Sequence, residues 1–311
     1  ELLVGELATP KQALLPIMAA IGGVLVPAGA YVAVNYSRGS LSGWGIPMAT
    51  DIAFALGVLT LLSKRVPLAL KVFLLALAIV DDLGAILIIA LFYSGEIAGS
   101  YLGVAMALIL FLAILNYAGI RNKFFGIFLG VIVWFCFLKS GIHATIAGVL
   151  LALITPAYNL VGGSEQKKPM LDAYIHDLHP WSAFIIMPIF AFFNAGVDVS
   201  GFTINEIVGA EVSLGIIFGL LVGKPVGVLS MTFIATKLRW ASLPAGTNWF
   251  QIAAVGFISA IGFTMSLFIA GLAFVDSQLV SYSKVSIIIA SVLAMGIGFL
   301  MLYFSTRPRN S

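Results

Sequence analysis

Residues 74–91 read Leu74-Leu-Ala-Leu-Ala-Ile-Val-Asp81-Asp82-Leu-Gly-Ala-Ile-Leu-Ile-Ile-Ala-Leu91, so two adjacent aspartates stand in the middle of a long apolar segment. An ionised carboxylate buried alone in hydrocarbon is costly, and such a pair needs a cation, a proton or a water-filled cavity as its partner. The remaining sequence therefore has to supply partners for Asp81 and Asp82.

The composition is typical of an all-α protein that crosses a membrane several times. Apolar residues make up 61% of the chain and charged residues only 9%, whereas soluble domains carry about 25% charged residues. We predict ten transmembrane segments, of which the fifth and sixth are short enough to form a tight hairpin or two half-depth helices. The segments cover residues 12–35, 46–63, 67–93, 100–118, 123–138, 141–156, 178–197, 212–235, 248–273 and 279–305.

The basic residues predict the orientation of the chain. They gather at alternate segment ends, which by the positive-inside rule places both termini in the cytoplasm. They form no stripe, so the net charge of +3 predicts no nucleic-acid partner. The chain opens on Glu1 without an initiating Met or a signal peptide, and we expect a fragment or a processed form.

Four charged side chains are predicted to meet near the middle of the membrane. Asp51 and Lys224 each lie thirteen residues from a basic residue at a cytoplasmic segment end, which is about 20 Å along a helix. Asp81 and Asp82 lie at about 24–26 Å by the same measure. Because the hydrocarbon core is about 30 Å thick, all four fall close to its centre.

Two segments are predicted to be interrupted at this depth. Gly43, Gly45 and Pro47 weaken the first half of the second segment, and the ninth contains the polar break Gly262-Phe-Thr264. Irregular backbone at membrane depth is tolerated only where it faces protein or a wet cavity. Both breaks therefore belong to a predicted site.

The two broken segments also predict an inverted repeat. They run in opposite directions, and a long segment flanks each of them on both sides. We predict a single transmembrane domain over residues 1–311, with repeats at about 12–93 and 212–305 and intervening helices at 100–197.

The residue types suggest a role for each charged group. Two close carboxylates in a low dielectric hold either a proton or a hard cation, which is what exchange of the two requires. Adjacent helical residues point about 100° apart, so only one of Asp81 and Asp82 can face the cavity fully. Lys224 is either a counter-charge released on protonation or a static ion-pair partner. Asp51, beside Thr50, either stabilises the break or binds the cation.

The chain resembles a known family over essentially all of its length. The Thr50-Asp51, Asp81-Asp82 and Gly223-Lys224-Pro225 motifs are similar to those of the NhaA family of sodium/proton antiporters. Further similar stretches are ATDIAFALG at 49–57, LAIVDDLGA at 77–85, LKSGIHAT at 138–145, HPW at 179–181, FAFFNAG at 190–196 and IGFTMS at 261–266.

This resemblance implies a twelve-helix bacterial inner-membrane fold with two crossed broken helices. It also implies pH-regulated, electrogenic exchange of Na⁺ or Li⁺ for more than one proton, without a cofactor. It assigns Asp82 as the carboxylate that binds the cation or proton, Asp81 as the partner of Lys224, and Thr50 and Asp51 to the helix crossing. About two N-terminal helices of the family pattern, including the hairpin for dimerisation, have no counterpart here, so the sequence is shortened relative to the family and a homodimer is in question.

Three residues match regions linked to pH regulation in the family. Glu1 matches a glutamate of the cytoplasmic mouth, and Lys139 and His143 match a stretch on the outer side. From the residues alone, His143 is either a pH-sensing imidazole or, as we expect, a hydrogen-bonded histidine at a helix start.

The sequence thus predicts a sodium/proton antiporter and no enzyme. One alternative is a Na⁺-coupled symporter of an organic solute on the same architecture. Another is an intramembrane aspartyl protease that uses Asp51 and Asp81, although the Gly-x-Gly-Asp motif is absent.

Overall fold

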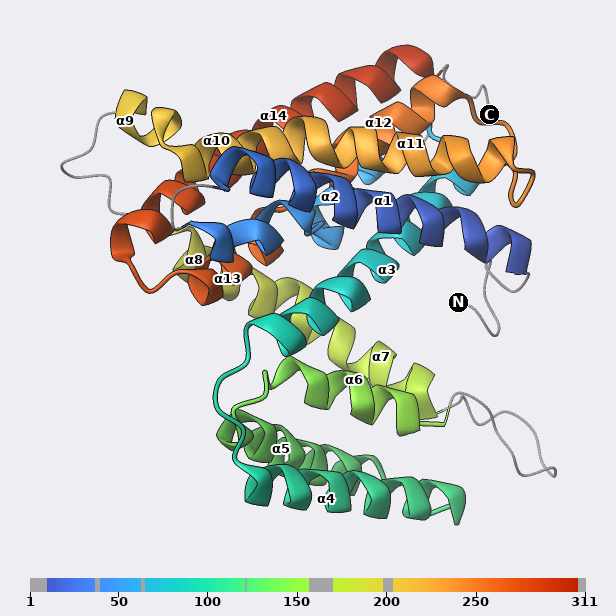
Figure 1. The fold of residues 1–311 in the computed structure, drawn as a ribbon. Helices are drawn as coiled ribbons and strands as arrows, with labels where there is room; N and C mark the ends of the chain where they lie inside the picture. The colour runs from blue at the N-terminus through green and yellow to red at the C-terminus, as the bar shows by residue number, and fades with distance from the viewer. Residues whose placement is uncertain are drawn as a thin grey trace. The chain divides into compact units, whose positions relative to one another are not determined.

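A computed structural model describes residues 10–36, 40–62, 65–120, 122–156, 170–197 and 204–306. These residues form helices and no strand (Figure 1). The elements are α1 (Pro10–Asn35), η1 (Leu41–Met48), α2 (Ile52–Leu61), α3 (Leu68–Phe92), α4 (Gly99–Tyr117), α5 (Lys123–Ser140), α6 (Thr145–Ile154), α7 (Met170–Trp181), η2 (Ser182–Ile186), α8 (Met187–Ala195), α9 (Ile204–Gly209), α10 (Glu211–Phe218), η3 (Gly219–Gly223), α11 (Lys224–Lys237), α12 (Trp249–Ser259), α13 (Phe263–Ala273) and α14 (Ser277–Ser305).

Each of the ten predicted segments coincides with a helical stretch. Within the described residues, eight stretches are long and apolar enough to cross a membrane, and the bent pair α12–α13 makes a ninth. The tenth, α6, is apolar but only 10 residues long. The seventh stretch begins at Met170, eight residues before the predicted start, because its first turns carry polar residues that lower the local hydropathy.

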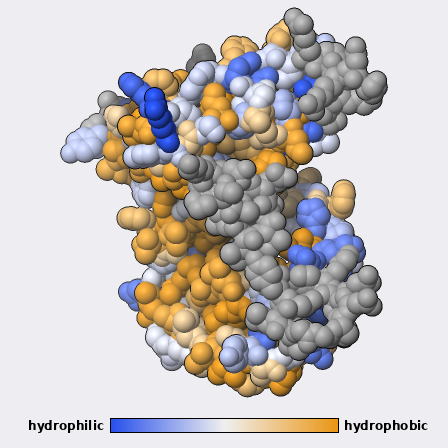
Figure 2. Space-filling model, turned by 90° about the vertical axis from the view of Figure 1, so that its right-hand side faces the viewer, coloured by the Kyte–Doolittle hydropathy of each residue, from blue (hydrophilic) through white to orange (hydrophobic). Residues whose placement is uncertain are grey.

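Much of the surface is hydrophobic, as expected for helices that face lipid. Figure 2 shows hydrophobic side chains across much of the visible face. Large apolar residues stand exposed along individual helices, among them Leu110 on α4 and Val131 on α5. Exposed apolar area on this scale is unusual for a soluble monomer and indicates a surface covered by other apolar material.

The chain forms two compact units. One comprises the residues up to Ala85 and from Ala191 onward, and the other comprises Ile86–Phe190. All the residues around Asp81 and Lys224 belong to the first unit, whereas Lys139 and His143 belong to the second. The division neither supports nor opposes the single transmembrane domain and its inverted repeat, which stay predictions.

In the first unit, α1 packs along α11 at unusually short range (Figure 1). Gly22 and Gly227 face each other, and a Cβ on either one would overlap the carbonyl oxygen of the other. Gly223 lies in the same way against the backbone of Pro27. Small residues let two helix backbones touch, and this contact sets where α11 holds its first residue, Lys224.

Both predicted breaks are present. The 3-10 helix η1 ends at Met48, the chain is extended at Ala49, and α2 starts at Ile52. Helices α12 and α13 are separated at residues 260–262 and meet at an angle of 45°. The two breaks lie against each other, because the Asp51 amide donates to the Ile261 carbonyl at 2.6 Å.

The glycine contact between α1 and α11 makes a stability prediction. We expect Gly22→Ala to lower the free energy of unfolding by about 1–3 kcal/mol, because the new methyl group forces the two backbones apart. Gly29→Ala on the same helix is the control, since a Cβ there meets no atom within 4 Å. Thermal unfolding in detergent measures both, and an equal transition temperature for the two variants would contradict the close contact.

Candidate functional site

The centre of the site is a buried ion pair between Asp81 on α3 and Lys224 at the start of α11. Both side chains are fully buried. The π-helix η3 immediately precedes Lys224, and such local widenings of a helix often occur at functional positions. Gly23 on α1 lies beside the lysine stem, and a Cβ at that position would make an ordinary contact with the Lys224 Cε at 3.5 Å. The predicted partnership of Asp81 and Lys224 is therefore present in the geometry.

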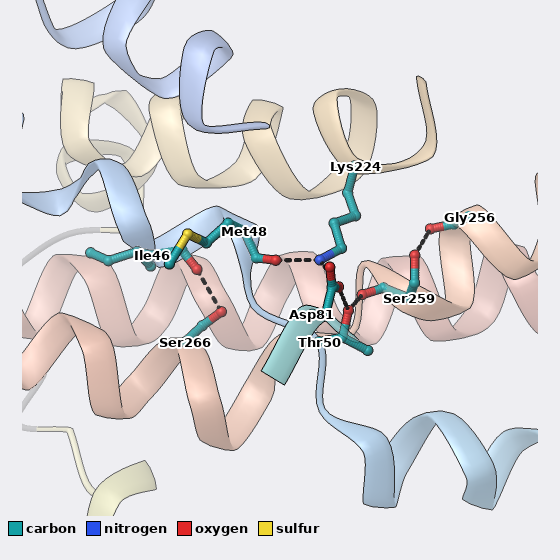
Figure 3. Close-up of polar contacts among 8 residues, drawn as sticks. All are labelled: Ile46, Met48, Thr50, Asp81, Lys224, Gly256, Ser259 and Ser266. Carbon is teal, nitrogen blue, oxygen red and sulfur yellow. Dashed lines mark hydrogen bonds and ion pairs between the residues drawn. The ribbon is translucent and has the colours of Figure 1, made fainter. Parts of the chain in front are cut away.

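The break between η1 and α2 supplies two further groups to this pair. Lys224 also donates to the carbonyl oxygen of Met48, the last residue of η1. The hydroxyl of Thr50 lies 2.6 Å from Asp81 Oδ2 and 2.8 Å from the carbonyl oxygen of Ser259, the last residue of α12. Figure 3 shows these groups converging from the η1–α2 break, α3, α11 and the end of α12, which are far apart in the sequence. The ends of η1 and α12 thus both place a backbone carbonyl at the site.

Asp51 stabilises the other ends of the two broken helices. Its Oδ1 accepts the Phe54 amide at 3.2 Å and caps α2. Its Oδ2 accepts the Thr264 amide at 2.9 Å and the Thr264 hydroxyl, in the first turn of α13. A carboxylate at a helix N-terminus satisfies unpaired amides and offsets the positive end of the helix dipole. Both oxygens of Asp51 are therefore occupied at the crossing, which favours stabilisation of the break over cation binding.

Two carboxylate oxygens at the site have no hydrogen-bond partner. Asp81 Oδ1 and Asp82 Oδ1 are both buried and unpaired, and Asp82 lies within electrostatic range of Asp81, Lys224 and Asp51. A buried oxygen left in this way is costly. A proton or a hard cation would satisfy both oxygens, and oxygen ligands are those that hard cations prefer.

Neutral oxygens lie close to Asp81 in addition to the carboxylates. Across the described ranges, no three His, Cys, Asp or Glu side chains are grouped closely enough to hold a metal ion. A cation between Asp81 and Asp82 would complete its shell with neutral oxygens, such as the Thr50 hydroxyl and the carbonyl groups at the helix ends.

Two of the three residues matched to pH regulation, Lys139 and His143, belong to the second compact unit. Lys139 lies in the last turn of α5, 5.8 Å from the centre of the Phe135 ring. His143 precedes α6, and its Nδ1 lies 3.0 Å from the Thr145 hydroxyl, as expected for a histidine at a helix start. Glu1 lies outside the described residues, and a regulatory role for all three stays a prediction.

The backbone carbonyls of Met48 and Ser259 are the functional groups that sequence reasoning missed. Residue types do not reveal backbone acceptors. The positions of the predicted breaks could have indicated these two groups, because the last carbonyl groups of a broken helix lack an intrahelical partner.

Comparison with known proteins identifies the family. The profile described as Na⁺/H⁺ antiporter 1 matches residues 1–302. The chain belongs to this family. Curated Na(+)/H(+) antiporter NhaA proteins from Escherichia coli O157:H7 and Shigella sonnei (strain Ss046) are each 50% identical over 99% of this chain and 79% of their own length. The NhaA resemblance and the antiporter class predicted from the sequence are confirmed, and the symporter and protease alternatives find no support.

The buried ion pair of this family member gives a testable energetic consequence. Lys224→Met leaves the Asp81 carboxylate buried and uncompensated, and we expect a loss of about 3–5 kcal/mol in the free energy of unfolding. The double variant Lys224→Met with Asp81→Asn removes both charges and should regain part of that loss. Unfolding in detergent compares the variants, and a double variant no more stable than the single one would contradict the pairing.

Proposed function

We propose that this chain is a multi-pass protein of the bacterial inner membrane, with both described ends facing the cytoplasm, that exchanges Na⁺ or Li⁺ for protons. Exchange is electrogenic and regulated by pH. The transported ions are its only substrates, it uses no cofactor, and it is not an enzyme. It assembles as a homodimer if the native chain carries the family's N-terminal hairpin.

The observation that carries this proposal is the pair of unpartnered oxygens on Asp81 and Asp82. Desolvation makes two neighbouring carboxylates unfavourable unless something positive joins them. Protons and Na⁺ satisfy the same oxygens, and each of the two carboxylates can take one proton, so more than one proton competes with a single Na⁺ for the site. Competition of this kind couples the two fluxes, because neither ion can occupy the site until the other has left it.

Each residue then has a part in the cycle. Asp82 binds Na⁺ when it is deprotonated, with Asp81 or Thr50 as a further ligand. Lys224 neutralises Asp81 and is released when that aspartate takes a proton. Gly262 and Thr264 keep the break in the α12–α13 pair open, and Asp51 holds the two breaks together. Rocking of the two repeats exposes the site to one side of the membrane at a time.

Substitution of Asp82 tests the proposal. In everted membrane vesicles, we expect Asp82→Asn to abolish the Na⁺-dependent dissipation of a pH gradient, because an amide cannot exchange a proton for a cation. Asp276→Asn is the matched control. Asp276 Oδ1 caps α14 by accepting the Gln278 amide at 2.8 Å, and the amide oxygen of Asn preserves that bond. Exchange undiminished in Asp82→Asn would refute the assignment.

A further inference from the structure

The first turn of α13 contacts the neighbouring break on both of its sides. After the break, Thr264 donates to Asp51 through its amide and its hydroxyl. Before the break, the hydroxyl of Ser266 donates to the carbonyl oxygen of Ile46 at 2.8 Å. Ile46 lies in the last turn of η1, so the two contacts hold the extended residues between them at both ends.

These contacts are buried and closely packed. Ser266 and Ile46 are fully inaccessible, and Figure 3 shows the Ser266 hydroxyl pointing at the Ile46 carbonyl on the far side of Met48 from Thr50. A Cβ on Gly262 would overlap the Ser266 hydroxyl and lie 3.2 Å from the Ala49 carbonyl oxygen. Gly262 therefore gives Ser266 the space from which it reaches η1.

Ser266 has no recorded contact with either charged partner of the site. The groups that do contact them follow Ile46 directly, namely the Met48 carbonyl, which accepts from Lys224, and the Thr50 hydroxyl, which meets Asp81. The end of a helix leaves its last carbonyls without intrahelical partners. Ser266 donates a hydrogen bond to one of these carbonyl groups, that of Ile46. Ile46 lies two residues before Met48 and four residues before Thr50.

We propose that Ser266 is a positioning residue for cation binding, which acts by fixing the backbone from Ile46 to Thr50. The proposal rests on the proposed function, because it assigns Ser266 a share in the affinity for Na⁺. Without its hydroxyl, the buried Ile46 carbonyl loses its partner and the end of η1 shifts to find another. The Thr50 hydroxyl and the Met48 carbonyl then leave the positions in which they complete the shell around Na⁺.

The primary test compares two serine substitutions in the full chain. We expect Ser266→Ala to raise the KM for Na⁺ by about three- to tenfold with a smaller change in the maximal rate, since one buried hydrogen bond is lost. Ser286→Ala is the control, because the buried Ser286 hydroxyl bonds only within its own helix, to the Tyr282 carbonyl at 2.7 Å. An unchanged KM in Ser266→Ala, or an equal rise in Ser286→Ala, would overturn the proposal.

A double-variant cycle separates positioning from a general loss of stability. If Ser266 acts through Thr50, then adding Ser266→Ala to Thr50→Ala raises the KM by less than about twofold, because coupled residues are not additive. Independent effects would multiply and would overturn the proposal. Ser266→Cys has a similar shape and a weaker hydrogen-bond donor, so its KM for Na⁺ should lie between those of the wild type and Ser266→Ala. This variant replaces Ser266→Ala in the test if Ser266→Ala does not fold.

The outcome also distinguishes this inference from the proposed function. Absence of Na⁺/H⁺ exchange in the wild-type chain would refute the function itself. Exchange in the wild type together with an unchanged KM in Ser266→Ala would refute only the role of Ser266. Stabilisation of the detergent-solubilised protein by added Na⁺ gives a readout of affinity that is independent of transport.

Discussion

The structure depends on the electrostatic cost of keeping carboxylates and an ammonium group out of water. Asp81 and Lys224 are fully buried, and each is tolerable only because the other is present. This pair is incomplete, because Asp81 Oδ1 and the neighbouring Asp82 Oδ1 remain without partners. In the proposed function, these two oxygens are where a proton or a metal ion binds.

The breaks in the two interrupted helices leave backbone groups that also need polar partners. Each break exposes amides at one helix end and carbonyls at the other. Asp51 accepts hydrogen bonds from amides in the first turns of α2 and α13. Lys224 and Thr50 donate hydrogen bonds to the last carbonyl groups of η1 and α12, respectively. The same few side chains thus stabilise the crossing and form the proposed ion site. A movement of either helix end would change the groups that contact Asp81. In the proposed function, this links the conformation of the broken helices to the binding of an ion.

The sequence predicted the parts of this structure that follow from hydropathy and from backbone chemistry. Long apolar runs located all ten segments, and glycine and proline near Asp51 located the first break. Charges at equal depth predicted that Asp51, Asp81, Asp82 and Lys224 would converge, and the family resemblance implied that Asp81 would pair with Lys224. The seventh segment was predicted to start at residue 178, whereas the helix starts at Met170. The polar residues within Met170–Asp177 lower the local hydropathy, so a hydropathy criterion does not include them. The bonds of Thr50 to Ser259 and of Lys224 to Met48 were not predictable, since they end on backbone oxygens whose positions depend on packing.

The central claim is that Na⁺ and protons compete for the oxygens of Asp81 and Asp82. The most direct measurement is the release of protons when Na⁺ is added to the purified protein in weakly buffered detergent solution. The account predicts that Na⁺ releases protons from the wild-type chain and none from Asp82→Asn. Binding of Na⁺ without proton release, or equal release from Asp82→Asn, would contradict it.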